Sequence, residues 1–179
     1  DSGTIVLGHR DSSIPFSYFG SDPQQPEGYS HDLQLKAVEA IKQKLGMPDL
    51  KVRYNLVTSQ TRIPLVQNGT VDLECGSTTN DLNRQKDVDF ANTTYVEQVR
   101  IAVKANSGIN DVKDLNGKTV ATTTGTTSVQ TLRKNERAGG IDFKEVYGKD
   151  HADSFLLLET GRADAFVMDG SILAGNISK

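Results

Sequence analysis

Two segments of the chain repeat one helix-to-strand pattern, and this repeat constrains the fold more than any other feature. Residues 65–72 and 157–164 each read as the end of a helix, a glycine that ends it, and a strand that opens with an aspartate. The separations agree, because 161 − 69 and 164 − 72 both give 92. We therefore expect an α/β chain with two similar halves, each with alternating strands and helices and a mainly parallel sheet.

The residues that follow the repeated strand differ between the two halves. In the first half a run of hydroxyl side chains leads to Arg84, and we expect a helical turn beginning near Thr79 or Asn80. Helix-start amides, hydroxyls and a guanidinium suit a carboxylate. A shift of 92 residues aligns Ser77 with Asp169, whose carboxylate could bind a cation. Two such halves suit a zwitterion; the alternative is a plain turn capped by Thr79 with a solvated Arg84.

Other candidate residues in the first half follow predicted strands. Residues 4–8 form an apolar run typical of a buried parallel strand, and Arg10 comes soon after it. Residues 51–57 alternate as a strand, and Ser59 and Arg62 follow where a short helix opens. Ligands collect at the carboxyl ends of parallel strands, so these side chains are candidate contacts. The alternative for Arg10 is a solvated loop position.

In the second half, a Gly-, Thr- and Ser-rich turn at residues 123–128 precedes a predicted helix, which makes it either an anion-binding turn or a plain cap. Asp150 is expected to cap a helix with His151 at its start and with Phe155, Leu156 and Leu158 facing inward. A histidine there is more often a surface or capping residue than a ligand group. Further expected elements are a helix at 30–45 capped by Ser30, a brief strand or turn at 88–91, a longer strand at 95–105, a short helix at 112–115 and a last helix at 170–179.

Composition excludes several classes of protein. The net charge of −3 gives no reason to expect a nucleic-acid partner or an acidic membrane surface. No apolar run approaches the ~20 residues that span a bilayer, so the chain is not expected to cross a membrane itself. Cys75 is the single cysteine, which excludes an internal disulfide and a metal site built on several cysteines. The first residues are no signal peptide, and one could have been removed.

Several motifs occur in the order seen in a known family, over nearly the whole chain. They are GHRDSSIPFSY, TSQTRIPL, ECGSTTNDLNRQK, TGTTS, KDHADSF and GRADAFVMD. Together they resemble the periplasmic amino-acid-binding proteins of bacterial ABC transporters, above all those for glutamate and aspartate. The resemblance implies two α/β lobes, residues 1–100 and 101–179, joined by hinge strands that cross near 97–105, with ligand in the cleft. Family members continue beyond this point and return to the first lobe, so the chain is apparently truncated at its C-terminus.

The resemblance also implies a role for each candidate residue. Arg84 would hold the ligand α-carboxylate, with help from Thr79 and from the amide at Thr126 or Thr127. Asp169 would accept the α-ammonium, assisted by Ser77. The side-chain carboxylate would lie among Arg10, Ser59, Arg62 and His151. Counting charges favours the same ligand independently, because a neutral amino acid would leave two arginines facing each other in a dry site, at a cost of several kcal/mol.

The implied function is binding of L-glutamate or L-aspartate and delivery to an ABC permease in the periplasm, with no catalysis, cofactor or metal. An enzyme on the same scaffold is the main alternative, similar to cyclohexadienyl dehydratase, with His151 or Asp169 as acid or base. A ligand-sensing domain of a receptor is a third hypothesis.

Overall fold

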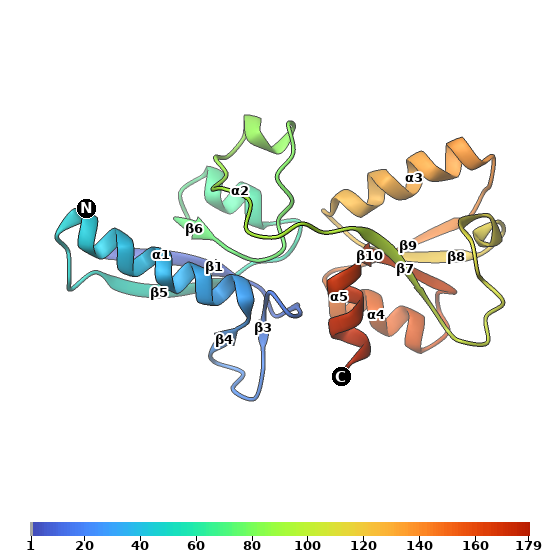
Figure 1. Cartoon of the computed structure of the whole chain (residues 1–179), viewed down its shortest axis with the longest axis horizontal. Helices are drawn as coiled ribbons and strands as arrows, with labels where there is room; N and C mark the ends of the chain where they lie inside the picture. The colour runs from blue at the N-terminus through green and yellow to red at the C-terminus, as the bar shows by residue number, and fades with distance from the viewer. Residues whose placement is uncertain (1) are drawn as a thin grey trace. The chain divides into compact units, whose positions relative to one another are not determined.

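The structure is a computed structural model that describes residues 2–179. The chain divides into two compact units, residues 1–94 and 95–179, each with its own sheet and core (Figure 1). This division precedes the boundary at residue 100 that the sequence suggested.

The first unit contains a parallel sheet with the strand order β5-β1-β6. Both faces of β1 are covered, as its continuous apolar sequence predicts. Leu7 packs with Val38 of α1 on one face, and Val6 packs with Val57 and Val71 on the other. The bounds in this sheet and its helices are β1 Thr4–His9, α1 Tyr29–Leu45, β5 Lys51–Leu56, α2 Arg62–Gln67, β6 Leu73–Glu74 and the 3-10 helix η1 Arg84–Lys86.

A small antiparallel sheet precedes α1 in the same unit and was not predicted. Its strands are β2 Ser12–Ser13, β3 Ser17–Phe19 and β4 Pro26–Glu27. Strands of two or three residues are too short for a periodic pattern in the sequence. Phe16, beside this sheet, is 4% exposed.

The second unit is a four-stranded sheet with the order β7-β10-β8-β9. Strands β10, β8 and β9 are parallel, and β7 pairs with β10 in the antiparallel direction. Figure 1 shows α3 on one face of this sheet and α4 with α5 on the other. The bounds are β7 Val99–Val103, η2 Val112–Leu115, β8 Thr119–Thr123, α3 Thr127–Gly139, β9 Lys144–Gly148, α4 His151–Glu159, β10 Ala165–Asp169 and α5 Gly170–Ile177.

Side chains of β10 alternate between the two faces of that sheet. Ala165 and Val167 join a core with Leu132 of α3. Phe166, between them in sequence, is fully buried and therefore belongs to the opposite face, against which α4 and α5 pack. Every residue from Ala165 to Met168 is buried, so the strand that carries Asp169 is held on both sides.

The two segments of the predicted repeat share a backbone conformation and a set of hydrogen bonds in the structure. Gly69 and Gly161 have φ angles of 78° and 75°, a region that side chains other than glycine rarely adopt. Asp72 Oδ2 accepts a hydrogen bond from the Val6 amide at 2.8 Å, and Asp164 Oδ2 accepts one from the Thr119 amide at the same distance. Each aspartate amide donates in return to the carbonyl of the same partner. Each repeat therefore ends a helix and fastens the next strand start to its neighbour.

The predicted capping role of Ser30 is wrong. Helix α1 begins at Tyr29, and its N-cap is Gly28, so Ser30 lies inside the first turn. Its hydroxyl donates to the Gly76 carbonyl at 2.7 Å, which fastens the start of α1 to the loop after β6.

The helical turn predicted at Thr79 or Asn80 is absent from the described chain. These residues are irregular, and η1 begins only at Arg84. Asp81 explains the delay, because its Oδ1 accepts the amides of Asn83 and Arg84 at 2.8 and 2.9 Å. An aspartate two or three residues earlier satisfies the first helical amides, as an N-cap does, and here it sets where the helix starts.

The structure also differs from the sequence-based expectation in two segments expected as strands and in the buried face of α4. The strand expected at 95–105 is limited to β7, and residues 88–91 form irregular chain with a bend at Val88. Leu156 was expected to face inward but is 53% exposed, whereas Leu158 is 5% exposed. The buried side of α4 consists of His151, Ser154 and Leu158, spaced three and four residues apart. Because two of these three residues are polar, the sequence does not show this side as an apolar stripe.

Candidate functional site

Arg10 is fixed at the carboxyl end of β1. Its side chain is fully buried, and its Nη2 donates to Ser59 Oγ at 2.7 Å. Its backbone amide donates to Ser17 Oγ at 2.9 Å. Ser59 is itself buried, in the turn between β5 and α2. These two candidate residues are therefore in direct contact, and the serine hydroxyl orients the guanidinium.

Arg62 brings a second guanidinium to the same end of the first sheet. It is the first residue of α2 and is 3% exposed. Its amide donates to the Thr58 carbonyl at 3.1 Å, within the turn that follows β5. Strands β1 and β5 are adjacent and parallel, so Arg10 and Arg62 both follow carboxyl ends of neighbouring strands. Arginine is seldom buried without anionic or hydrogen-bonding partners, so two buried guanidinium groups mark this end of the sheet as polar.

The loop after β6 holds the remaining candidates of the first unit. Arg84 Nη1 donates to the Thr79 carbonyl at 2.9 Å, and its Nε lies 3.8 Å from Asp81 Oδ2. Its side chain is 13% exposed. Ser77 Oγ donates to Ser13 Oγ at 3.3 Å, which joins the loop to β2. Arg84 and Thr79 are thus in contact through the backbone carbonyl of Thr79, and their role toward a ligand stays a prediction.

Thr126 and Thr127 form the N-terminus of α3 in the second unit. Thr126 is the N-cap and Thr127 the first helical residue. Thr126 Oγ1 donates to the Thr123 carbonyl at 2.8 Å, so its side chain closes the turn rather than capping a helical amide. A helix start presents amides without intrahelical acceptors, which is the chemistry that binds carboxylates.

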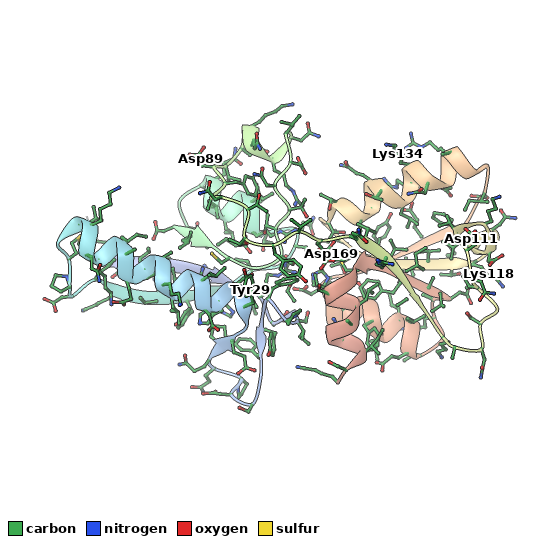
Figure 2. The ribbon with its side chains drawn as sticks, in the orientation of Figure 1. Tyr29, Asp89, Asp111, Lys118, Lys134 and Asp169 are labelled. Carbon is green, nitrogen blue, oxygen red and sulfur yellow. The ribbon has the colours of Figure 1, made fainter. Side chains whose placement is uncertain are left out.

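His151 is buried, contrary to the surface or capping role considered more common for such a residue. It is 1% exposed, and its Nδ1 lies 3.0 Å from Thr123 Oγ1. Asp150 caps α4 as predicted, because its Oδ1 accepts the His151 amide at 2.8 Å. Asp169 ends β10 and is half-buried at the N-cap of α5 (Figure 2).

The repeat relates the contacts of the two units. Val6 and Thr119 are equivalent partners of the repeated aspartates, and 119 − 6 equals 113, as does 123 − 10. Thr123 thus takes the position of Arg10. Ser59 and His151 are likewise equivalent, since 151 − 59 gives 92. Each unit therefore joins a residue at a strand end to one that follows the neighbouring strand: Arg10 to Ser59 in the turn before α2, and Thr123 to His151 at the start of α4.

Thr123 is the residue that sequence reasoning missed. It was placed in the turn at residues 123–128, either an anion-binding turn or a plain cap, and received no role of its own, because a threonine at a strand end carries no signal. The shift of 113 residues that aligns Thr123 with Arg10 could not be found in the sequence, because β1 and β8 share no motif that would align them.

Residues 2–179 contain no group of three or more histidine, cysteine, aspartate or glutamate side chains suited to a metal ion. Burial raises the pKa of the Cys75 thiol to about 12, with a smaller contribution from Glu74, so the thiol stays protonated and unreactive. No helix in the described chain is long and apolar enough to cross a bilayer.

Comparison with known proteins points to one family. Residues 5–163 match the bacterial extracellular solute-binding proteins, family 3. Over 179 residues the chain is 56% identical to an L-glutamate/L-aspartate-binding protein of Pseudomonas aeruginosa, covering 100% of this chain and 59% of that relative. It is 49% identical over 178 residues to a glutamate/aspartate import solute-binding protein of Salmonella typhimurium, covering 99% and 59%. The chain thus spans about three fifths of the length of these relatives.

A solved structure supports the fold. An ancestral arginine-binding protein bound to arginine superposes with a TM-score of 0.81 at 29% identity, over 98% of this chain and 74% of that one. The predicted α/β periplasmic-binding-protein fold is therefore confirmed.

Proposed function

Because the chain belongs to family 3 of the bacterial extracellular solute-binding proteins, we propose that it binds an acidic amino acid, L-glutamate or L-aspartate. Support comes from relatives named for these two ligands at 56% and 49% identity. The two ligands differ by one methylene group, and both carry the second carboxylate on which the proposal depends.

We assign the ligand side-chain carboxylate to Arg10, Ser59 and Arg62 of the first unit and to His151 of the second. The observation that carries this assignment is the burial of Arg10 and Arg62, at 0% and 3% exposed, at the ends of adjacent strands. A carboxylate offsets their charge through bidentate hydrogen bonds. A neutral side chain would not, and the difference of several kcal/mol gives the discrimination.

We assign the remaining charges of the ligand to the other candidates. The α-carboxylate would be held by Arg84 and Thr79 with the helix-start amides of Thr126 or Thr127. The α-ammonium would be accepted by Asp169, with Ser77 assisting. Three arginines against one aspartate complement a ligand with two carboxylates and one ammonium.

The transport role follows from the same proposal. A ligand that contacts residues of both units stabilises a closed form through contacts that the open form lacks, with residues 97–105 as a hinge. The closed form would then be presented to an ABC permease at the outer face of the inner membrane, in the periplasm. The relatives named above are binding proteins, which favours binding over the dehydratase and sensor alternatives.

A thermal-shift panel tests the proposal. The chain is melted with L-glutamate, L-aspartate, L-glutamine and L-histidine at one saturating concentration. We expect a rise in Tm with the two acidic ligands, since a ligand that binds only the folded state stabilises it. An equal or larger rise with L-glutamine or L-histidine would overturn the acidic assignment. Turnover of prephenate or arogenate would instead support an enzyme.

A further inference from the structure

His151 lies at one end of a buried chain of hydroxyl groups. Thr123 Oγ1 is 3.0 Å from His151 Nδ1 and 2.8 Å from Ser154 Oγ. Ser154 Oγ in turn lies 3.1 Å from the Thr122 carbonyl oxygen and 3.2 Å from the Asp150 carbonyl oxygen. Thr123 and Ser154 are fully buried, so water does not compete for these contacts.

The direction of each hydrogen bond follows from counting protons. A carbonyl oxygen can only accept, so the single Ser154 hydroxyl proton points to a backbone carbonyl. Ser154 Oγ must then accept from Thr123, because otherwise two lone pairs would face each other at 2.8 Å. With its own proton used, Thr123 Oγ1 accepts from His151 Nδ1. The network therefore assigns a proton to Nδ1 whether the imidazole is neutral or charged.

We propose that this hydroxyl chain makes acidic-ligand binding take up a proton at His151, with Thr123 as the positioning residue. The inference rests on the proposed function. With Nδ1 always protonated, a neutral imidazole presents only the lone pair of Nε2, which repels a carboxylate. A second proton turns Nε2 into a donor and His151 into a cation that a carboxylate stabilises.

The charged groups around the start of α4 are few. On its own helix, Asp150 accepts the His151 amide and Asp153 is exposed. Strand β8 has no charged residue within its bounds, and Thr122 and Thr123 are two of its hydroxyl residues.

On the neighbouring strands, Glu145 and Tyr147 of β9 are bound to Arg133 of α3, and Lys149 is exposed. Asp169 ends β10, and α5 has no charged residue within its bounds.

The same geometry predicts how amide ligands behave. The side-chain NH2 of L-glutamine can donate to the lone pair of neutral Nε2, so its binding needs no proton. Selectivity for L-glutamate over L-glutamine should therefore fall as the pH rises.

Calorimetry of L-glutamate binding in two buffers of different ionisation enthalpy measures proton uptake directly. We expect uptake that approaches about one proton per ligand at pH 8 and falls towards zero at pH 5.5. The Kd of L-glutamate should rise by up to about tenfold per pH unit above the pKa of the imidazole in the free protein. L-glutamate binding with no proton uptake at either pH would overturn the inference and leave the proposed function standing. An absence of L-glutamate binding at every pH would overturn both.

Substitutions of Thr123 and Thr122 distinguish the positioning of His151 from a general effect on the stability of the fold. Thr123→Val keeps the shape and removes the hydroxyl, and we expect about a tenfold rise in the Kd of L-glutamate at pH 6 with a weaker pH dependence. Thr123→Ser should restore both. The matched control is Thr122→Val, which removes the neighbouring buried hydroxyl that donates to the Val167 carbonyl at 3.1 Å and should leave the pH profile unchanged.

If Thr123→Val does not fold, the ring ¹⁵N shifts of His151 in the unsubstituted chain decide the assignment. Shifts of the neutral Nδ1–H tautomer at high pH support the inference. Shifts of the Nε2–H tautomer contradict it.

Discussion

The substitution Arg10→Lys tests the fork geometry that we assign to the ligand side-chain site. Lysine keeps the positive charge but loses the planar guanidinium, so it cannot grip two carboxylate oxygens or hold Ser59 in the same way. Arg10 is fully buried, and its Nη2 donates to Ser59 Oγ at 2.7 Å. The change therefore removes hydrogen bonds without removing charge.

The expected loss follows from the value of one charged hydrogen bond. Such a bond contributes about 1.5–3 kcal/mol. Since about 1.4 kcal/mol corresponds to tenfold in Kd, the Kd of L-glutamate should rise about 10- to 150-fold. The Kd of L-glutamine should change less, because its side-chain amide has a single oxygen and cannot accept a bidentate pair of hydrogen bonds from the guanidinium.

Calorimetric titration at fixed salt measures both constants. Arg53→Lys is the control, since Arg53 lies on β5 of the same sheet but is exposed, and it should bind as the unsubstituted chain does. Binding by Arg10→Lys within twofold of the unsubstituted chain would refute the reasoning. Should that variant fail to fold, Ser59→Ala applies the milder test, with a smaller loss in the same direction.

Three further outcomes follow from the structure. Asp72→Ala and Asp164→Ala should each lower the free energy of unfolding by about 1–3 kcal/mol in urea titrations, because each carboxylate accepts a backbone amide at 2.8 Å; a loss at only one site would deny their equivalence. Cys75 should resist a disulfide reagent at pH 8 until denaturant is added, since its pKa is raised to about 12, and rapid labelling of the native chain would show otherwise. Burial lowers the pKa of His9 from 6.5, so the fold binds fewer protons there than the unfolded chain. Stability should then fall as the pH drops from 6.5 through the lowered pKa, and less so in His9→Gln; identical pH profiles would speak against this cause.

The sequence predicted those parts of the fold that depend on local pattern. The repeat around Gly69 and Gly161 combines a glycine that needs positive φ with an aspartate that binds a backbone amide, and both are readable from residue type. The continuous apolar run of β1 likewise indicated a strand covered on both faces.

Predictions failed where a distant partner decides the local structure. Ser30 has the residue type of an N-cap, yet its hydroxyl binds the Gly76 carbonyl, 46 residues away in sequence. The helix start expected at Thr79 failed for a local reason instead, because Asp81 accepts the amides of Asn83 and Arg84. Thr123 gave no signal because its role depends on His151, 28 residues later. Candidate residues could be named from motifs, but their hydrogen-bond partners could not.

Crystals grown with L-glutamate would test the central claim most directly. The account predicts density for one amino acid whose side-chain carboxylate contacts the guanidinium groups of Arg10 and Arg62 and whose ammonium contacts Asp169. It is contradicted if bound glutamate lies away from both arginines, or if Asp169 takes no part in holding the ammonium.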